Sequence, residues 1–67
     1  MVARIAAEGG LSARETEVLG YLARGRSQPY ICDALVLSKN TVASHVKHIY
    51  QKLNVHSRQE LLDLFAN

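Results

Sequence analysis

The 67-residue sequence has a single cysteine, a single proline, no tryptophan and no long run of apolar residues. Because Cys32 has no second cysteine to pair with, the sequence argues against an oxidised, secreted scaffold and predicts a cytoplasmic location. The longest purely apolar run is four residues, far short of the roughly 20 that span a bilayer. The sequence also shows no signal peptide, repeat or low-complexity tract.

Residue sets that carry catalysis are missing as well. The sequence has no paired carboxylates, no glycine-rich phosphate loop and no Ser/His/Asp set, and it is too short to enclose a cavity of the usual ligand size. His45 and His48 could hold a metal from one helix face, but no third ligand follows at a recognisable spacing. We therefore predict a protein that is not an enzyme and has no cofactor, metal site or small-molecule site.

The apolar residues of the sequence recur at the spacing of α-helices. At 48% hydrophobic, the chain is globular rather than disordered, and its length allows one small domain. The spacing of the apolar residues predicts an all-α, four-helix fold, with helices at residues 12–24, 28–36, 39–53 and 58–66. Residues 1–10 are expected to be a linker or flexible segment with at most a frayed helical turn, and residues 11–67 the domain.

Serines mark the expected start of every helix. N-caps are predicted at Ser12, Ser27, Ser38 and Ser57. Glu15 and Glu60 lie three residues after the first and last of these serines, which is the spacing of a capping box. Gly25 and Asn54 suit the left-handed conformation that often ends a helix.

The predicted helix at residues 39–53 has two contrasting faces. An apolar stripe with steps of 4, 3 and 4 comprises Val42, Val46, Ile49 and Leu53. The opposite face is small and polar, then cationic, and comprises Asn40, Ala43, Ser44, Lys47 and Gln51. With the short connection from the preceding helix, the pair forms a helix-turn-helix, whose second helix can dock through its stripe and offer its other face to the major groove of DNA.

Positive charge is concentrated in the same part of the chain. The net charge is only +2, but residues 38–58 contain four lysines and arginines and no acid. All three histidines lie in this range too. Such a local field attracts polyanions, although a solvated basic face is the alternative interpretation.

Short motifs recur at fixed spacing from Leu11 to about Leu64. They comprise Leu11, Ser12, Arg14 and Glu15; Glu17, Val18 and Leu19; Ala23, Gly25 and Ser27; Ser38, Thr41, Val42 and His45; and Ile49, Lys52, Leu53, Val55, Ser57 and Arg58. In this pattern the chain resembles the C-terminal DNA-binding domain of LuxR-type (NarL/FixJ-like) bacterial transcription regulators.

The resemblance implies sequence-specific binding of double-stranded DNA, with the helix at 39–53 in the major groove. It further implies a homodimer through the last helix and an upstream sensor or receiver region in the full-length protein. The family's groove-facing positions correspond to Lys39, Asn40, Thr41, Ala43, Ser44 and Lys47. Phosphate contacts are expected from Ser27, Gln28, Tyr30, His48, Gln51 and Lys52. The chain departs from the common pattern at Ala43, where many members have lysine, and at residues 28–30, where many have Asn-Lys-Glu.

Two roles and one function remain open at this point. Lys47 is the first choice for a base contact, most simply to guanine, and a good contact of that kind discriminates by about 1–3 kcal/mol. A phosphate contact by Lys47 is equally compatible with the sequence. Arg58 is expected to pair with Glu15 or Glu17 and so to tie the last helix to the first, and a free surface arginine is the alternative. The alternative function is a helical protein-interaction module that keeps the helix-turn-helix shape.

Overall fold

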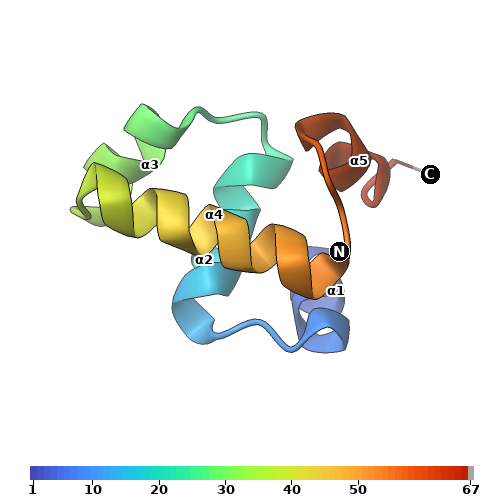
Figure 1. Cartoon of the computed structure of the whole chain (residues 1–67). Helices are drawn as coiled ribbons and strands as arrows, with labels where there is room; N and C mark the ends of the chain where they lie inside the picture. Colours follow the sequence, from blue (N-terminus) through green and yellow to red (C-terminus); the bar gives the residue numbers. More distant parts are fainter. Residues whose placement is uncertain (67) are drawn as a thin grey trace.

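The structure, a computed structural model, describes residues 1–66, and within them every regular element is an α-helix. The helices are α1 (Val2–Gly9), α2 (Ala13–Ala23), α3 (Gln28–Leu35), α4 (Lys39–Leu53) and α5 (Arg58–Asp63). In Figure 1, α4 crosses in front of α2, with α3 near its beginning and α5 near its end. The all-α prediction is confirmed. The described residues contain five helices, however, and α5 ends at Asp63 rather than at residue 66.

The helix missing from the prediction is α1, in the segment expected to be a linker. Ala6 is only 4% exposed and belongs to the hydrophobic core. Gly10 ends the helix in a left-handed conformation, with φ of 71°. Gly9 lies so close to Leu53 that a Cβ at this position would collide with the leucine side chain. The segment is therefore helical because it docks on α2 and on the end of α4, a tertiary contact that local sequence does not reveal.

Serine N-caps begin the other four helices, as predicted. The side chains of Ser12, Ser27, Ser38 and Ser57 each accept a hydrogen bond from the backbone N–H three residues further on. The first cap is a full capping box, because the Ser12 N–H also donates to Glu15 Oε1 at 2.9 Å. The last is not, because Glu60 Oε1 accepts from the N–H of His56 at 2.8 Å instead of from Ser57.

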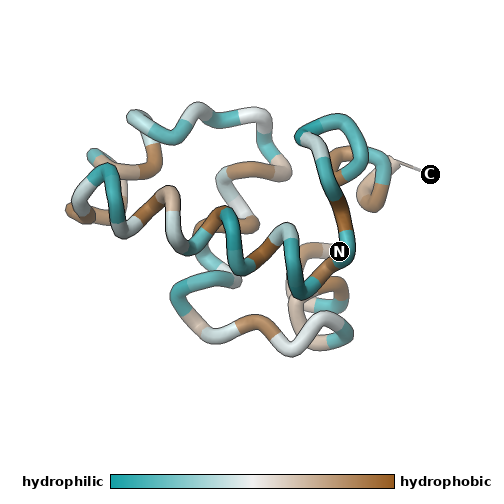
Figure 2. Tube along the Cα trace, in the orientation of Figure 1, coloured by the Kyte–Doolittle hydropathy of each residue, from teal (hydrophilic) through white to brown (hydrophobic). Residues whose placement is uncertain are grey.

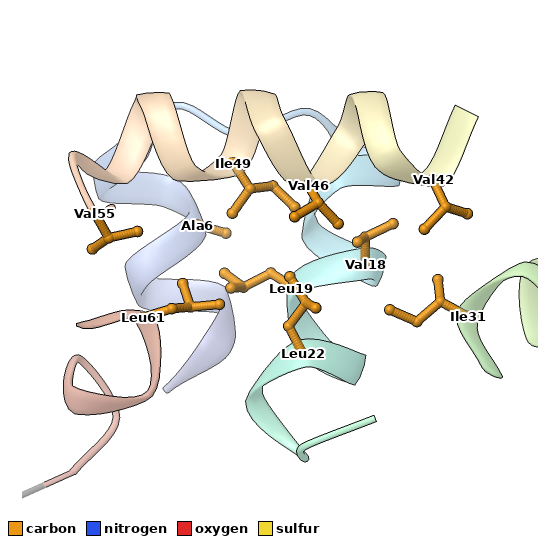
Figure 3. Close-up of a cluster of buried hydrophobic side chains, with 10 residues drawn as sticks. All are labelled: Ala6, Val18, Leu19, Leu22, Ile31, Val42, Val46, Ile49, Val55 and Leu61. Carbon is orange, nitrogen blue, oxygen red and sulfur yellow. The ribbon is translucent and has the colours of Figure 1, made fainter. Parts of the chain in front are cut away.

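One hydrophobic core joins all five helices, and Figure 3 shows the side chains that form it. The predicted stripe of α4 contributes Val42, Val46 and Ile49, while Leu53 is only partly buried beside the core. The stripe meets the fully buried Val18, Leu19 and Leu22 of α2. Ala6, Ile31, Val55 and Leu61 complete the cluster. Figure 2 shows the result on α4, where hydrophobic and hydrophilic residues alternate with the turns of the helix.

The turn from α3 to α4 is short and left-handed. Val36 ends α3 with φ of 53° and ψ of 51°, and its side chain is 89% exposed. The next residue, Leu37, donates its N–H to Cys32 O at 3.0 Å, and Ser38 then caps α4. A β-branched residue in this region is strained, so the turn is held by the packing of the two helices it connects.

None of the helices within residues 1–66 is long and apolar enough to cross a membrane.

Candidate nucleic-acid interface

The outward face of α4 is exposed along its whole length. The six residues predicted to face a groove all lie on it with exposed side chains, and they are Lys39, Asn40, Thr41, Ala43, Ser44 and Lys47. No ion pair within the described chain involves Lys39 or Lys47. Because the other side of α4 is buried, this face is held in one orientation and its side chains are turned to solvent.

The start of α4 is organised by Ser38 and Thr41. Ser38 Oγ accepts from the Thr41 N–H at 3.1 Å and lies 2.8 Å from Thr41 Oγ1, to which it donates. No acidic residue lies in the first turn of the helix. The positive end of the α4 dipole is therefore not neutralised by a side chain of its own first turn, and it favours an anion such as phosphate.

The predicted phosphate-contacting residues of α3 cluster at its first turn. The Ser27 hydroxyl accepts from the Tyr30 N–H at 3.3 Å, and Gln28 is exposed beside them. Gln28 also lines an open surface hollow of about 500 Å³ together with Lys39, the first residue of α4. The structure thus brings the beginnings of α3 and α4 together on one surface. His48 and Gln51 are exposed further along α4.

Lys52 has a partner inside the protein, which argues against its predicted phosphate contact. Its Nζ lies 2.8 Å from Glu15 Oε1, and the Glu15 side chain is only 7% exposed. The hydrogen bond from Lys52, followed by that from the Ser12 N–H, lowers the pKa of Glu15 from 4.5 to about 2. His48 Nδ1 lies 3.8 Å from Glu15 Oε2, so it also faces this carboxylate. Lys52 therefore ties α4 to the start of α2.

Arg58 does not pair with Glu15 or Glu17, contrary to the prediction. Its Nη2 donates to Arg26 O at 2.6 Å and to Leu22 O at 3.4 Å, both backbone oxygens near the end of α2. Glu17 is instead paired with Arg14 at 3.4 Å. Arg58 consequently anchors α5 to the end of α2 and to the α2–α3 loop.

Two features were missed by reasoning from the sequence. The Glu15–Lys52 pair could have been found from the register, because Glu15 falls among the buried positions of α2 and needs a partner there. The second is a cluster of tyrosines and arginines around the α2–α3 loop, for which the only signal was the Arg-Gly-Arg sequence between Tyr21 and Tyr30. Within residues 1–66, no three His, Cys, Asp or Glu side chains converge as a metal site requires.

These observations define the class of protein. A capped helix, docked through one apolar stripe and joined to its predecessor by a short turn, is a helix-turn-helix domain of the DNA-binding type. The comparison with protein families agrees, since the model described as "Bacterial regulatory proteins, luxR family" matches residues 9–65. The chain belongs to the LuxR family of bacterial regulatory proteins, and its class of function is DNA-binding transcription regulation.

Curated relatives resemble this chain over the same region. The Fimbriae Z protein of Escherichia coli (strain K12) is 49% identical over 53 residues, which cover 79% of this chain and 25% of that protein. The Oxygen regulatory protein NreC of Staphylococcus carnosus (strain TM300) is 43% identical over 53 residues, covering 79% of this chain and 24% of the relative. The chain thus spans about a quarter of the length of these relatives. No solved structure matches the chain.

Proposed function

We propose that this domain binds double-stranded DNA sequence-specifically, with α4 in the major groove, as the output domain of a bacterial transcription regulator. The observation that carries the proposal is the exposed, acid-free face of α4 on a helix whose opposite side is buried. The major groove, about 12 Å wide, admits an α-helix, and its base edges carry a pattern that distinguishes all four base pairs.

Small side chains on this face favour close approach. Ala43 and Ser44 lie in the middle of the first half of α4, so the helix backbone can come near the base edges there. Ala43 suits a thymine methyl group, and Asn40 can form two hydrogen bonds with adenine. Lys47 is one turn further on and carries the free charge that suits guanine N7 and O6. Thr41, engaged with Ser38, suits a phosphate at the groove edge.

The electrostatic contribution is smaller than the sequence suggests. Of the four basic residues within 38–58, Lys52 and Arg58 are bound to Glu15 and to backbone carbonyl groups respectively. Lys39 and Lys47 have no ion pair within the described chain. The positive ends of α3 and α4 are the other contributions to phosphate binding. A monomer with so few phosphate contacts binds weakly, because each contact contributes about 0.9 to the salt slope and a proportionate share of affinity.

Dimerisation through α5 would compensate for this weakness. Leu64 is 40% exposed just after α5, and Leu62 and Phe65 are partly buried beside it. A second copy covering these side chains gives a two-fold symmetric protein, and hence two DNA half-sites at a spacing of about one helical turn or a multiple. The upstream region of the full-length protein, which we propose carries the sensor or receiver, then controls when the two domains meet.

An NMR titration with duplex DNA at low salt tests the proposal. Amide shift changes concentrated at residues 39–47 and at the first turn of α3 are expected, with affinity that falls steeply as salt is added. If those amides do not move, the domain uses its helix-turn-helix shape for protein contacts instead, and the proposal is wrong.

A further inference from the structure

Two tyrosines and two arginines form a cluster where α2 passes into α3. The rings of Tyr21 and Tyr30 lie 5.9 Å apart, tilted by 58°. The guanidinium carbon of Arg26 lies 4.9 Å from the centre of the Tyr30 ring, and that of Arg24 lies 5.9 Å from the centre of the Tyr21 ring. Both distances fall within the roughly 6 Å of a cation–π contact.

The charge of this cluster is not compensated nearby. Neither Arg24 nor Arg26 forms an ion pair within the described chain. Glu17, which lies one turn before Tyr21 on α2, is paired with Arg14 at 3.4 Å. Arg24 and Arg26 are exposed, so two unpaired cations lie at the surface beside aromatic rings. Tyrosine and arginine are the residue types that dominate protein-binding hot spots.

A glycine next to the cluster has no role inside the protein. Gly20 lies in the interior of α2, where glycine destabilises a helix relative to alanine. A Cβ added to it would meet nothing within 4 Å, so no neighbouring helix requires the small residue. It lines an open hollow of about 250 Å³ with Thr16, Glu17, Tyr21 and Arg24 on the same helix, and the Glu17 carboxylate there is paired with Arg14. The hollow is large enough for a side chain from another molecule.

The direction of this surface separates it from the groove-facing side of α4. Thr16, Gly20 and Arg24 follow one another at four-residue spacing along α2, and thus share a face. The residues of α2 that pack against α4 and the core are on its other side and are fully buried. The Gly20 face therefore points away from α4, and it stays accessible when α4 lies in a groove.

We propose that this surface, made of Gly20, Tyr21, Arg24 and Arg26, binds an acidic segment of a partner protein while the domain is on DNA. Carboxylates of the partner accept hydrogen bonds from the two guanidinium edges, and an apolar side chain of the partner enters the hollow over Gly20. Charge complementarity selects an acidic partner, and the orientation of α2 argues for a protein rather than the bound duplex.

The test uses a synthetic 16-residue helical peptide with a leucine stripe flanked by glutamates, and a matched peptide with lysines in place of the glutamates. The glutamate peptide should shift the amides of residues 16–26 in a saturable way, and the lysine peptide should not. The double variant R24A/R26A should bind it about tenfold more weakly, which is the loss expected for one or two charge-assisted hydrogen bonds. Arg4→Ala, on the exposed part of α1, is the matched control and should bind normally.

A parallel DNA titration keeps this proposal separate from the proposed function. Arg24→Ala should leave DNA affinity and its salt dependence unchanged, whether or not α4 reads bases as proposed. If Arg24→Ala instead weakens DNA binding and lowers the salt slope, the surface belongs to the DNA interface and the proposal is wrong. The absence of a saturable shift with the glutamate peptide, or equal shifts with both peptides, also overturns it.

Discussion

Replacing Lys52 with methionine tests whether this lysine stabilises the fold or contacts DNA. Lys52 Nζ lies 2.8 Å from Glu15 Oε1, in a pair whose carboxylate side is only 7% exposed. The substitution keeps most of the unbranched side chain and removes the charged ammonium group, so Glu15 loses its main partner. The expected result is a less stable domain at neutral pH with no direct loss at the DNA surface.

The magnitude follows from the pKa of Glu15, which is lowered from 4.5 to about 2. At about 1.4 kcal/mol per unit, a shift of this size corresponds to at most roughly 3–4 kcal/mol of stability. Lys52 supplies only part of the shift, and its side chain is 41% exposed, so solvent screens the interaction. We expect Lys52→Met to lower the free energy of unfolding by about 1–2 kcal/mol at pH 7.

The loss of stability in Lys52→Met should depend on pH. Because the pKa of Glu15 is lower in the folded state, its contribution is present in full above pH 4.5 and is lost as the pH falls towards 2. The difference between the natural protein and Lys52→Met should therefore shrink over that interval. Urea unfolding followed by circular dichroism at several pH values measures it, and a loss of 1 kcal/mol lowers the midpoint of thermal unfolding by about 4–8 °C in a domain of this size.

Lys47→Met is the matched control, because Lys47 has no ion pair within the described chain and should not affect stability. Equal stability of Lys52→Met and the natural protein across the pH range, combined with weaker DNA binding and a smaller salt slope, would refute the reasoning. Lys52 would then be the phosphate contact that the sequence alone suggested.

Three further substitutions test the turn, α2 and α1. Val36→Asn should raise stability by about 1 kcal/mol, because asparagine tolerates the left-handed conformation better than an exposed valine does; thermal unfolding measures it. Gly20→Ala should also raise stability, by about 0.5–1 kcal/mol in the same assay, since its Cβ meets nothing within 4 Å; a loss would contradict the open space at this position. Gly9→Val should lower stability by about 1–2 kcal/mol through its collision with Leu53. If the amides of residues 2–9 exchange as slowly in this variant as in the natural protein, the docking of α1 is contradicted.

Local sequence signals predicted most of the fold, because most of the helix boundaries depend on neighbouring residues. A serine N-cap and its acceptor role involve residues three positions apart, and all four predicted caps are present. The left-handed conformations of Gly25 and Asn54 are equally local, and both are confirmed. α1 lacked a capping signal at its start, and its burial depends on contacts with α2 and with Leu53, the latter more than forty residues away.

The candidate site was also predictable from the sequence only where local spacing decides the structure. The spacing of apolar residues was enough to predict which face of α4 is exposed, and hence the accessibility of Lys39 and Lys47. The partners of long cationic side chains were not predictable in this way. Lys52 and Arg58 contact groups 37 and 32 residues away in the sequence, so only the packing of the helices decides what they bind.

Selection of bound sequences from random DNA duplexes tests whether the outward face of α4 reads base pairs. We expect an enriched sequence with two half-sites. Lys47→Ala should relax the preference at one position of each half-site, whereas Lys39→Ala should weaken binding to all sequences alike. Recovery of no preferred sequence, or an equal and uniform loss with both variants, would contradict the account.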